Sequence, residues 1–129
     1  MSSKNYASGS VCQNLCSTLS DTLSEKQNNL IKATANWVVS QVSPRLNYIQ
    51  YSSNLVAFRK SIIDFLTLQF KNLDCANLRT IGSHSNLYEI AVNVNIPTVV
   101  LPQYISIIIN NEMSYYLKKS SLHRNIISY

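Results

Sequence analysis

Acidic residues are scarce in this chain, since only six Asp and Glu stand among 129 residues. Asp64 and Asp74 are ten residues apart, too far for two carboxylates to share one turn of a helix. Paired carboxylates are the usual means of general acid-base hydrolysis. No such constellation is visible, so the sequence argues against a hydrolase of this kind.

Glycine is scarcer still, with only Gly9 and Gly82. Loops that cradle phosphates need several glycines, and neither a P-loop nor a Rossmann fingerprint is present. The patterns G-x-S-x-G and H-E-x-x-H are missing as well. We therefore expect no enzyme, no catalytic residues and no cofactor.

The three cysteines, Cys12, Cys16 and Cys75, are too few and odd in number for a secreted disulfide framework. Cys12 and Cys16 can share a helical face and bind zinc with Cys75 and either His84 or His123. No C-x-x-C or H-x-x-x-H spacing supports that arrangement, so we expect buried thiols and no metal. Pairing Cys75 with His84 as nucleophile and base has no better support.

Long apolar runs are lacking too. The longest, around residues 98–109, is interrupted by Pro102, Gln103 and Ser106. A membrane-spanning helix needs about 20 apolar residues. No basic, apolar leader precedes the first cysteine. We expect an intracellular protein, cytoplasmic or nuclear, without a membrane partner.

What the chain does have is a modest excess of positive charge. Eleven Lys and Arg give a net charge of +5 and a pI near 9.2, although only 13% of residues are charged. Neutral polar residues take the remaining surface positions, and such a surface repels its own copies weakly. We therefore expect a homo-oligomer. The abundance of Asn, Ile, Ser and Tyr suits an AT-rich genome, so a viral or mobile-element origin is our hypothesis.

Hydrophobic periodicity predicts a mainly α protein. Residues 1–10 are polar and read as a flexible tail, and residues 11–129 read as a single helical domain. A capping box, Thr22 with Glu25, predicts a helix over 23–42 that ends before Pro44. The other expected helices cover 11–20, 54–73 and 103–119, and the helix over 54–73 is the central one.

Residues 88–96 support two interpretations. Large apolar residues alternate with polar or small ones, which is typical of a half-buried strand and would give a short β-hairpin near 88–101. Alternatively, Asn86 as N-cap with Glu89 at N3 predicts a short helix over 87–93. The expected fold class is a small helical bundle, with or without that hairpin.

The helical alternative resembles the helix-turn-helix pattern of bacterial regulators. Residues 86–105 carry Ile90 and Ala91 in the first helix, Asn95 in the turn and Pro97 at the start of the second. The resemblance implies a DNA-binding regulator centred on 86–105, with the second helix in the major groove.

Basic residues supply the candidate nucleic-acid contacts, because Lys and Arg neutralise phosphates and tyrosines such as Tyr115, Tyr116 and Tyr129 can stack on bases. Our leading hypothesis is a non-enzymatic, self-associating protein that contacts RNA or DNA through scattered basic residues. A helical adaptor that binds another protein is the alternative. The candidate residues are Arg59, Lys60, Lys71, Lys118, Lys119 and Arg124, with Arg45 and Arg79 as further contributors.

Overall fold

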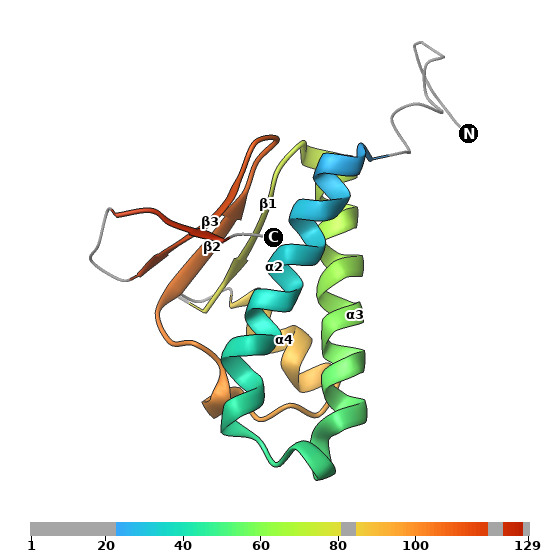
Figure 1. Ribbon diagram of the computed structural model, residues 1–129, viewed down its shortest axis with the longest axis vertical. Helices are drawn as coiled ribbons and strands as arrows, with labels where there is room; N and C mark the ends of the chain where they lie inside the picture. The colour runs from blue at the N-terminus through green and yellow to red at the C-terminus, as the bar shows by residue number, and fades with distance from the viewer. Residues whose placement is uncertain (1–22, 81–84, 119–122, 128–129) are drawn as a thin grey trace.

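The computed structural model describes residues 23–80, 85–118 and 123–127 (Figure 1). Two long helices come first, followed by a strand, a short helix and three further strands. The elements are α2 (Glu25–Val42), η2 (Ser43–Arg45), α3 (Tyr48–Leu73), β1 (Ala76–Arg79), α4 (Asn86–Asn93), η3 (Thr98–Val100), β2 (Ile105–Ile109), β3 (Ser114–Lys118) and β4 (Asn125–Ile127).

The fold is mixed α/β, and the prediction of a small helical bundle is wrong. The strands form one four-stranded antiparallel sheet in the order β1-β2-β3-β4. In Figure 1 the helical hairpin of α2 and α3 stands beside this sheet, and α4 lies behind α2, in contact with α3 and β1. The expected tail 1–10 and helix 11–20 lie outside the described residues.

Helix α2 confirms the predicted helix over 23–42, but its cap differs. Ser24 is the N-cap: its side chain accepts from the Gln27 amide, and the Gln27 side chain accepts in return from the Ser24 amide. This is the reciprocal capping box that was assigned to Thr22 and Glu25, shifted by two residues. Pro44 then lies in the 3-10 turn η2 that follows the helix.

The central helix α3 also exists, and it begins six residues before the expected start at 54. The Asn47 side chain caps it by accepting from the amides of Ile49 and Gln50. The buried stripe of α3 faces α2 and the sheet. It consists of Leu55, Phe58, Ile62, Leu66 and Phe70.

A two-residue turn leads from α3 into the edge strand β1. Asp74 adopts the left-handed conformation, with φ of 58°, and its amide donates to the Phe70 carbonyl. The free edge of β1 is occupied by side chains: Gln69 accepts from the Asn77 amide, and Asn86 accepts from the Arg79 amide. These hydrogen bonds satisfy backbone groups that could otherwise pair with another strand.

Residues 105–118 form a β-hairpin, so the final helix expected over 103–119 is wrong. Buried and half-buried residues alternate along β2, with Ile105, Ile107 and Ile109 buried. The Asn110 side chain accepts from two amides in the following turn, those of Glu112 and Met113. Four isoleucines in five residues fit helical and strand periods equally well, and cross-strand pairing with β1 and β3 decides for the strand.

Of the two interpretations of residues 88–96, the helix is correct and the hairpin near 88–101 is wrong. Helix α4 covers Asn86–Asn93, with Ser85 rather than Asn86 in the N-cap position. Asn95 does take the left-handed conformation expected of the turn, with φ of 60°. The second helix of a helix-turn-helix does not follow, because Thr98–Val100 is a single 3-10 turn and Ile105–Ile109 is a strand.

One hydrophobic core lies between the helices and the inner face of the sheet. Leu78 and Ile107, which are partners in neighbouring strands, are both fully buried there. Helix α4 adds Leu87, Ile90 and Ala91 to the same cluster. The described helices therefore cover one face of the sheet and not its outer face.

Candidate functional site

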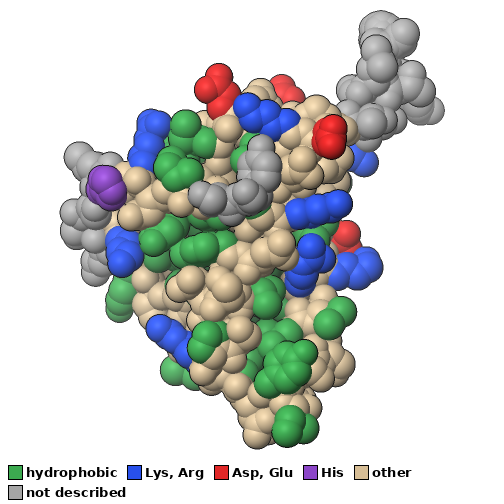
Figure 2. Space-filling model, in the orientation of Figure 1, with side chains coloured by type: hydrophobic (Ala, Val, Ile, Leu, Met, Phe, Trp, Pro, Cys, Tyr) green, Lys and Arg blue, Asp and Glu red, His purple; other side chains and the backbone are tan. Residues whose placement is uncertain are grey.

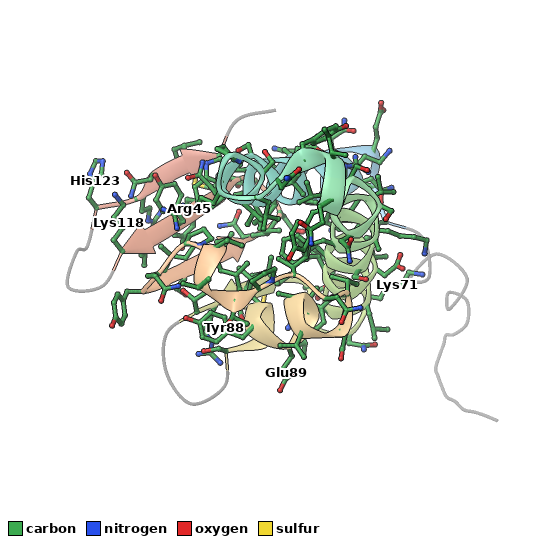
Figure 3. All side chains as sticks on the ribbon, turned by 90° about the horizontal axis from the view of Figure 1, so that it is seen from below. Arg45, Lys71, Tyr88, Glu89, Lys118 and His123 are labelled. Atoms are coloured by element: carbon green, nitrogen blue, oxygen red, sulfur yellow. The ribbon has the colours of Figure 1, made fainter. Side chains whose placement is uncertain are left out.

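The structure does not gather the predicted basic residues into one surface. Lys71 is exposed in the last turn of α3, whereas Lys118 ends β3 and Arg124 precedes β4. Figure 3 places Lys71 and Lys118 on opposite sides of the molecule. Lys119 lies outside the described residues.

Two of the predicted cations are already engaged within the protein. The Arg59 Nε donates to the Asn36 Oδ1 at 2.6 Å, which ties α3 to α2. The Lys60 Nζ lies 2.9 Å from the Asp64 carboxylate, one helical turn away, and both side chains are exposed. Exposed pairs of this kind contribute little to stability.

The outer face of the sheet is a stronger candidate. Side chains alternate across a strand, so the residues between the buried ones point away from the helices. Their cross-strand pairs, Arg79 with Ser106 and Ile108 with Tyr115, follow from the register. The outward-facing residues are Asn77, Arg79, Ser106, Ile108, Tyr115, Leu117 and Ile126.

This outer face combines aromatic, aliphatic and cationic groups. The Arg124 guanidinium lies over the Tyr115 ring, 4.9 Å from its centroid. Arg79 and Arg124 are exposed, as is Ile126, and none of the outward-facing strand residues that the structure describes is acidic. Such a face attracts anions and offers flat apolar surface at the same place.

A polar pocket of about 280 Å³ opens at the end of the sheet where β2 begins and β3 ends. Trp37 and Tyr116 stack along it with ring centroids 4.5 Å apart. Figure 3 shows Arg45, Lys118 and His123 on this side of the molecule. The polar and aromatic lining residues are Trp37, Gln41, Arg45, Gln103, Tyr116 and Lys118.

A third surface lies at the tip of the α2–α3 hairpin. Tyr48, Ile49 and Val56 are 69%, 91% and 71% exposed. Beside them is a groove of about 280 Å³ between the two helices, with Leu55 and Val56 in its lining and Arg59 at its edge. Figure 2 shows hydrophobic side chains gathered at this lower end of the molecule.

The described residues do not bring together the cysteines and histidines that the sequence suggested as a metal or nucleophile site. Cys75 is a free, exposed thiol. Cys12, Cys16 and His84 lie outside the described residues. Within the described part of the chain, no three His, Cys, Asp or Glu side chains come close enough to hold a metal ion.

Sequence reasoning missed Trp37, Gln41 and Gln103 as site residues. Trp37 and Gln41 come from α2, and Gln103 comes from the segment before β2. Residues this far apart in sequence give no local motif. Tyr115 and Tyr116 were identified as stacking candidates, but only the strand assignment shows that consecutive tyrosines point to opposite faces.

Comparison with family models, curated protein sequences and solved structures finds no match to the chain. Among the described residues, none of the helices combines the length and the apolar character needed to cross a bilayer. The function is therefore argued from the surfaces alone.

Proposed function

We propose that the outer face of the sheet binds single-stranded nucleic acid without strict sequence preference. The observation that carries the proposal is the Arg124 guanidinium over the Tyr115 ring, on a sheet face whose described strand residues include no outward-facing carboxylate. Aromatic rings and guanidinium planes on sheets of this kind stack on unpaired bases, and cations beside them bind the phosphates.

The layout of the face suits a short stretch of single strand. Arg79 lies on β1 and the Arg124 guanidinium lies over β3, two strand spacings or about 10 Å across the sheet. Tyr115, Ile108 and Leu117 occupy the space between. A base that takes the place of the guanidinium on Tyr115 leaves Arg124 to pair with the adjacent phosphate. Two or three bases fill a face of this width.

A duplex fits this face less well. Its bases are stacked inside the helix, so Tyr115 and the aliphatic residues around it would gain nothing from it. A duplex would then be bound through its phosphates alone. Few exposed cations of this face can bind them, namely Arg79 and Arg124. The proposal therefore replaces scattered basic contacts with a stacking platform flanked by two arginines.

The test is fluorescence anisotropy of labelled oligo-U, oligo-dT and a matched duplex at low salt. We expect single strands to bind more tightly than the duplex, and Tyr115→Ala and Arg124→Gln each to weaken binding about tenfold, since one stacked base contributes about 1–3 kcal/mol. Lys71→Gln, on the opposite side of the molecule, is the control and should leave binding unchanged. Equal losses in the control, or no binding at low salt, would refute the proposal.

A second candidate is self-association through the tip of the α2–α3 hairpin. This tip carries both a protruding side chain, Ile49, and an apolar groove beside it. A protrusion and a groove on the same surface allow two copies to contact each other reciprocally about a two-fold axis. Light scattering should then show a dimer that Ile49→Glu splits, while Leu68→Glu, a change at another exposed position of α3, does not. A monomer at high concentration would exclude this candidate.

A further inference from the structure

The pocket at the end of the sheet contains two cations with no counter-charge of their own. Arg45 and Lys118 both line it and are exposed, and neither forms an ion pair with any described residue. No acidic side chain is among the lining residues that the structure describes. Two cations beside one small cavity favour an anionic occupant. An Arg fork with a Lys beside it matches the oxygens of a phosphate.

The pocket lining is also aromatic. Trp37 on α2 and Tyr116 on β3 stack at a centroid distance of 4.5 Å with 29° between their planes. Pro102 and Ile105 add apolar surface to the same lining. A lining that combines stacked aromatic rings with two cations is suited to a flat ring that carries a phosphate.

Amide groups complete the pocket, and one of them is held in place. The Tyr88 hydroxyl donates to the Gln103 Oε1 at 3.0 Å, and the Gln103 Nε2 donates to the Leu101 carbonyl at 3.0 Å. Gln41 lies in the same lining and is exposed. An amide carries both a donor and an acceptor, which is what the edge of a nucleobase requires.

We propose that this pocket binds one nucleotide, with the phosphate on Arg45 and Lys118 and the base against Trp37 and Tyr116. The volume of about 280 Å³ is close to the lower limit of ligand pockets, so a single nucleotide is the largest occupant of this class. The source is either a free nucleoside monophosphate or the 5′-phosphorylated end of a strand. The pocket shares no residue with the stacking face of Arg79, Tyr115 and Arg124, so the inference does not depend on the proposed function.

Trp37 is the single tryptophan of the chain and lies in the pocket wall, so its fluorescence reports occupancy directly. The protein is titrated with adenosine 5′-monophosphate, adenosine, inorganic phosphate, and one oligonucleotide in 5′-phosphorylated and 5′-hydroxyl forms. We expect saturable quenching by the monophosphate and by the phosphorylated oligonucleotide, with much weaker binding of adenosine. Binding of the phosphorylated oligonucleotide that is tighter than that of both its 5′-hydroxyl form and the monophosphate assigns the pocket to strand ends, and tighter binding of the monophosphate assigns it to free nucleotides.

Substitutions of the two cations test whether the monophosphate binds in this pocket. Arg45→Gln and Lys118→Gln should each weaken the monophosphate about tenfold, because each removes a charged partner of the phosphate. Both side chains are exposed, so the fold should persist, and circular dichroism checks this. Lys71→Gln and Tyr115→Ala should not change the monophosphate titration, and the second of these separates the pocket from the sheet face. Absence of saturable quenching at millimolar ligand, equal binding of adenosine, or unchanged affinity in the Arg45 and Lys118 variants would overturn the inference.

Discussion

The hydroxyls of Thr34 and Ser114 lie 2.6 Å apart in the core and join α2 to β3, 80 residues further along the chain. Both residues are fully buried. The Thr34 hydroxyl donates its hydrogen to the Leu30 carbonyl at 2.8 Å, so the Ser114 hydroxyl supplies the hydrogen for the bond between them. This is a polar contact in an apolar interior, and each group satisfies the other.

Thr34→Val should destabilise the fold by about 1–3 kcal/mol, since it keeps the shape of the side chain and leaves the Ser114 hydroxyl buried without its partner. Adding Ser114→Ala removes that stranded hydroxyl, so the double variant should lose less than the two single variants combined. Urea unfolding of the four proteins measures the coupling. Strictly additive losses would show that the two hydroxyls do not act as a pair.

Phe58 is fully buried on the central helix α3, whereas Val56, two residues earlier, is 71% exposed. Phe58→Ala should therefore cost about 3–5 kcal/mol, because it leaves a cavity between α3 and its neighbours. The matched change Val56→Ala should stay within about 0.5 kcal/mol. Chemical denaturation of both variants checks the assignment of the buried stripe, and a similar cost for the two would contradict it.

Asn86 holds the first turn of α4 against the free edge of β1. Its side chain accepts from the Arg79 amide at 2.7 Å and donates to the Asn77 carbonyl at 3.2 Å. Asn86→Ala should cost about 1–2 kcal/mol and speed hydrogen exchange at the Arg79 amide. Asn93→Ala, at the exposed end of the same helix, is the control. Unchanged exchange at Arg79 in the Asn86 variant would show that the edge is protected in another way.

The proposed stacking face also predicts a shallow salt dependence. If Arg79 and Arg124 are the two phosphate contacts, the plot of log affinity against log salt should have a slope of about −1.4 for a single strand. Arg79→Gln should bring the slope to about −0.7, while Tyr115→Ala should lower affinity with little change in slope. The measurement is anisotropy over a range of salt concentrations. A slope several times steeper would mean that many more cations take part than this face contains.

Some features of the fold were predictable because they are local. The apolar periods of α2 and α3 predicted both helices, and Asn95 was expected in the left-handed turn that it adopts. Even there the boundaries shifted, since Ser24 rather than Thr22 caps α2, and Asn47 caps α3 before its expected start at residue 54. Several polar residues near a helix start can serve as a cap, and packing selects among them.

The strands were not predictable in the same way. Ile105–Ile109 is compatible with a helix, and β1 lies in a segment where the sequence predicted neither helix nor strand. Pairing of β1 with β2 joins Ala76 to Ile109 across more than thirty residues. Hydrophobic periodicity is evaluated over short stretches of sequence, and no such stretch includes both of these paired strands. The interpretation as a helical bundle was wrong for this reason.

The candidate sites likewise combine features that the sequence predicts with features that depend on the tertiary structure. The sequence by itself determined the inventory: a surplus of cations, many tyrosines, one tryptophan, two glycines, and two long amphipathic helices. Only the tertiary structure decided that Lys71 and Lys118 lie on opposite sides, that Tyr115 and Tyr116 point to opposite faces, and that Arg45 and Lys118 share a pocket with Trp37. The physical reason is that helix periods and caps are set within a few residues, whereas sheet register and pockets are set by contacts between distant segments.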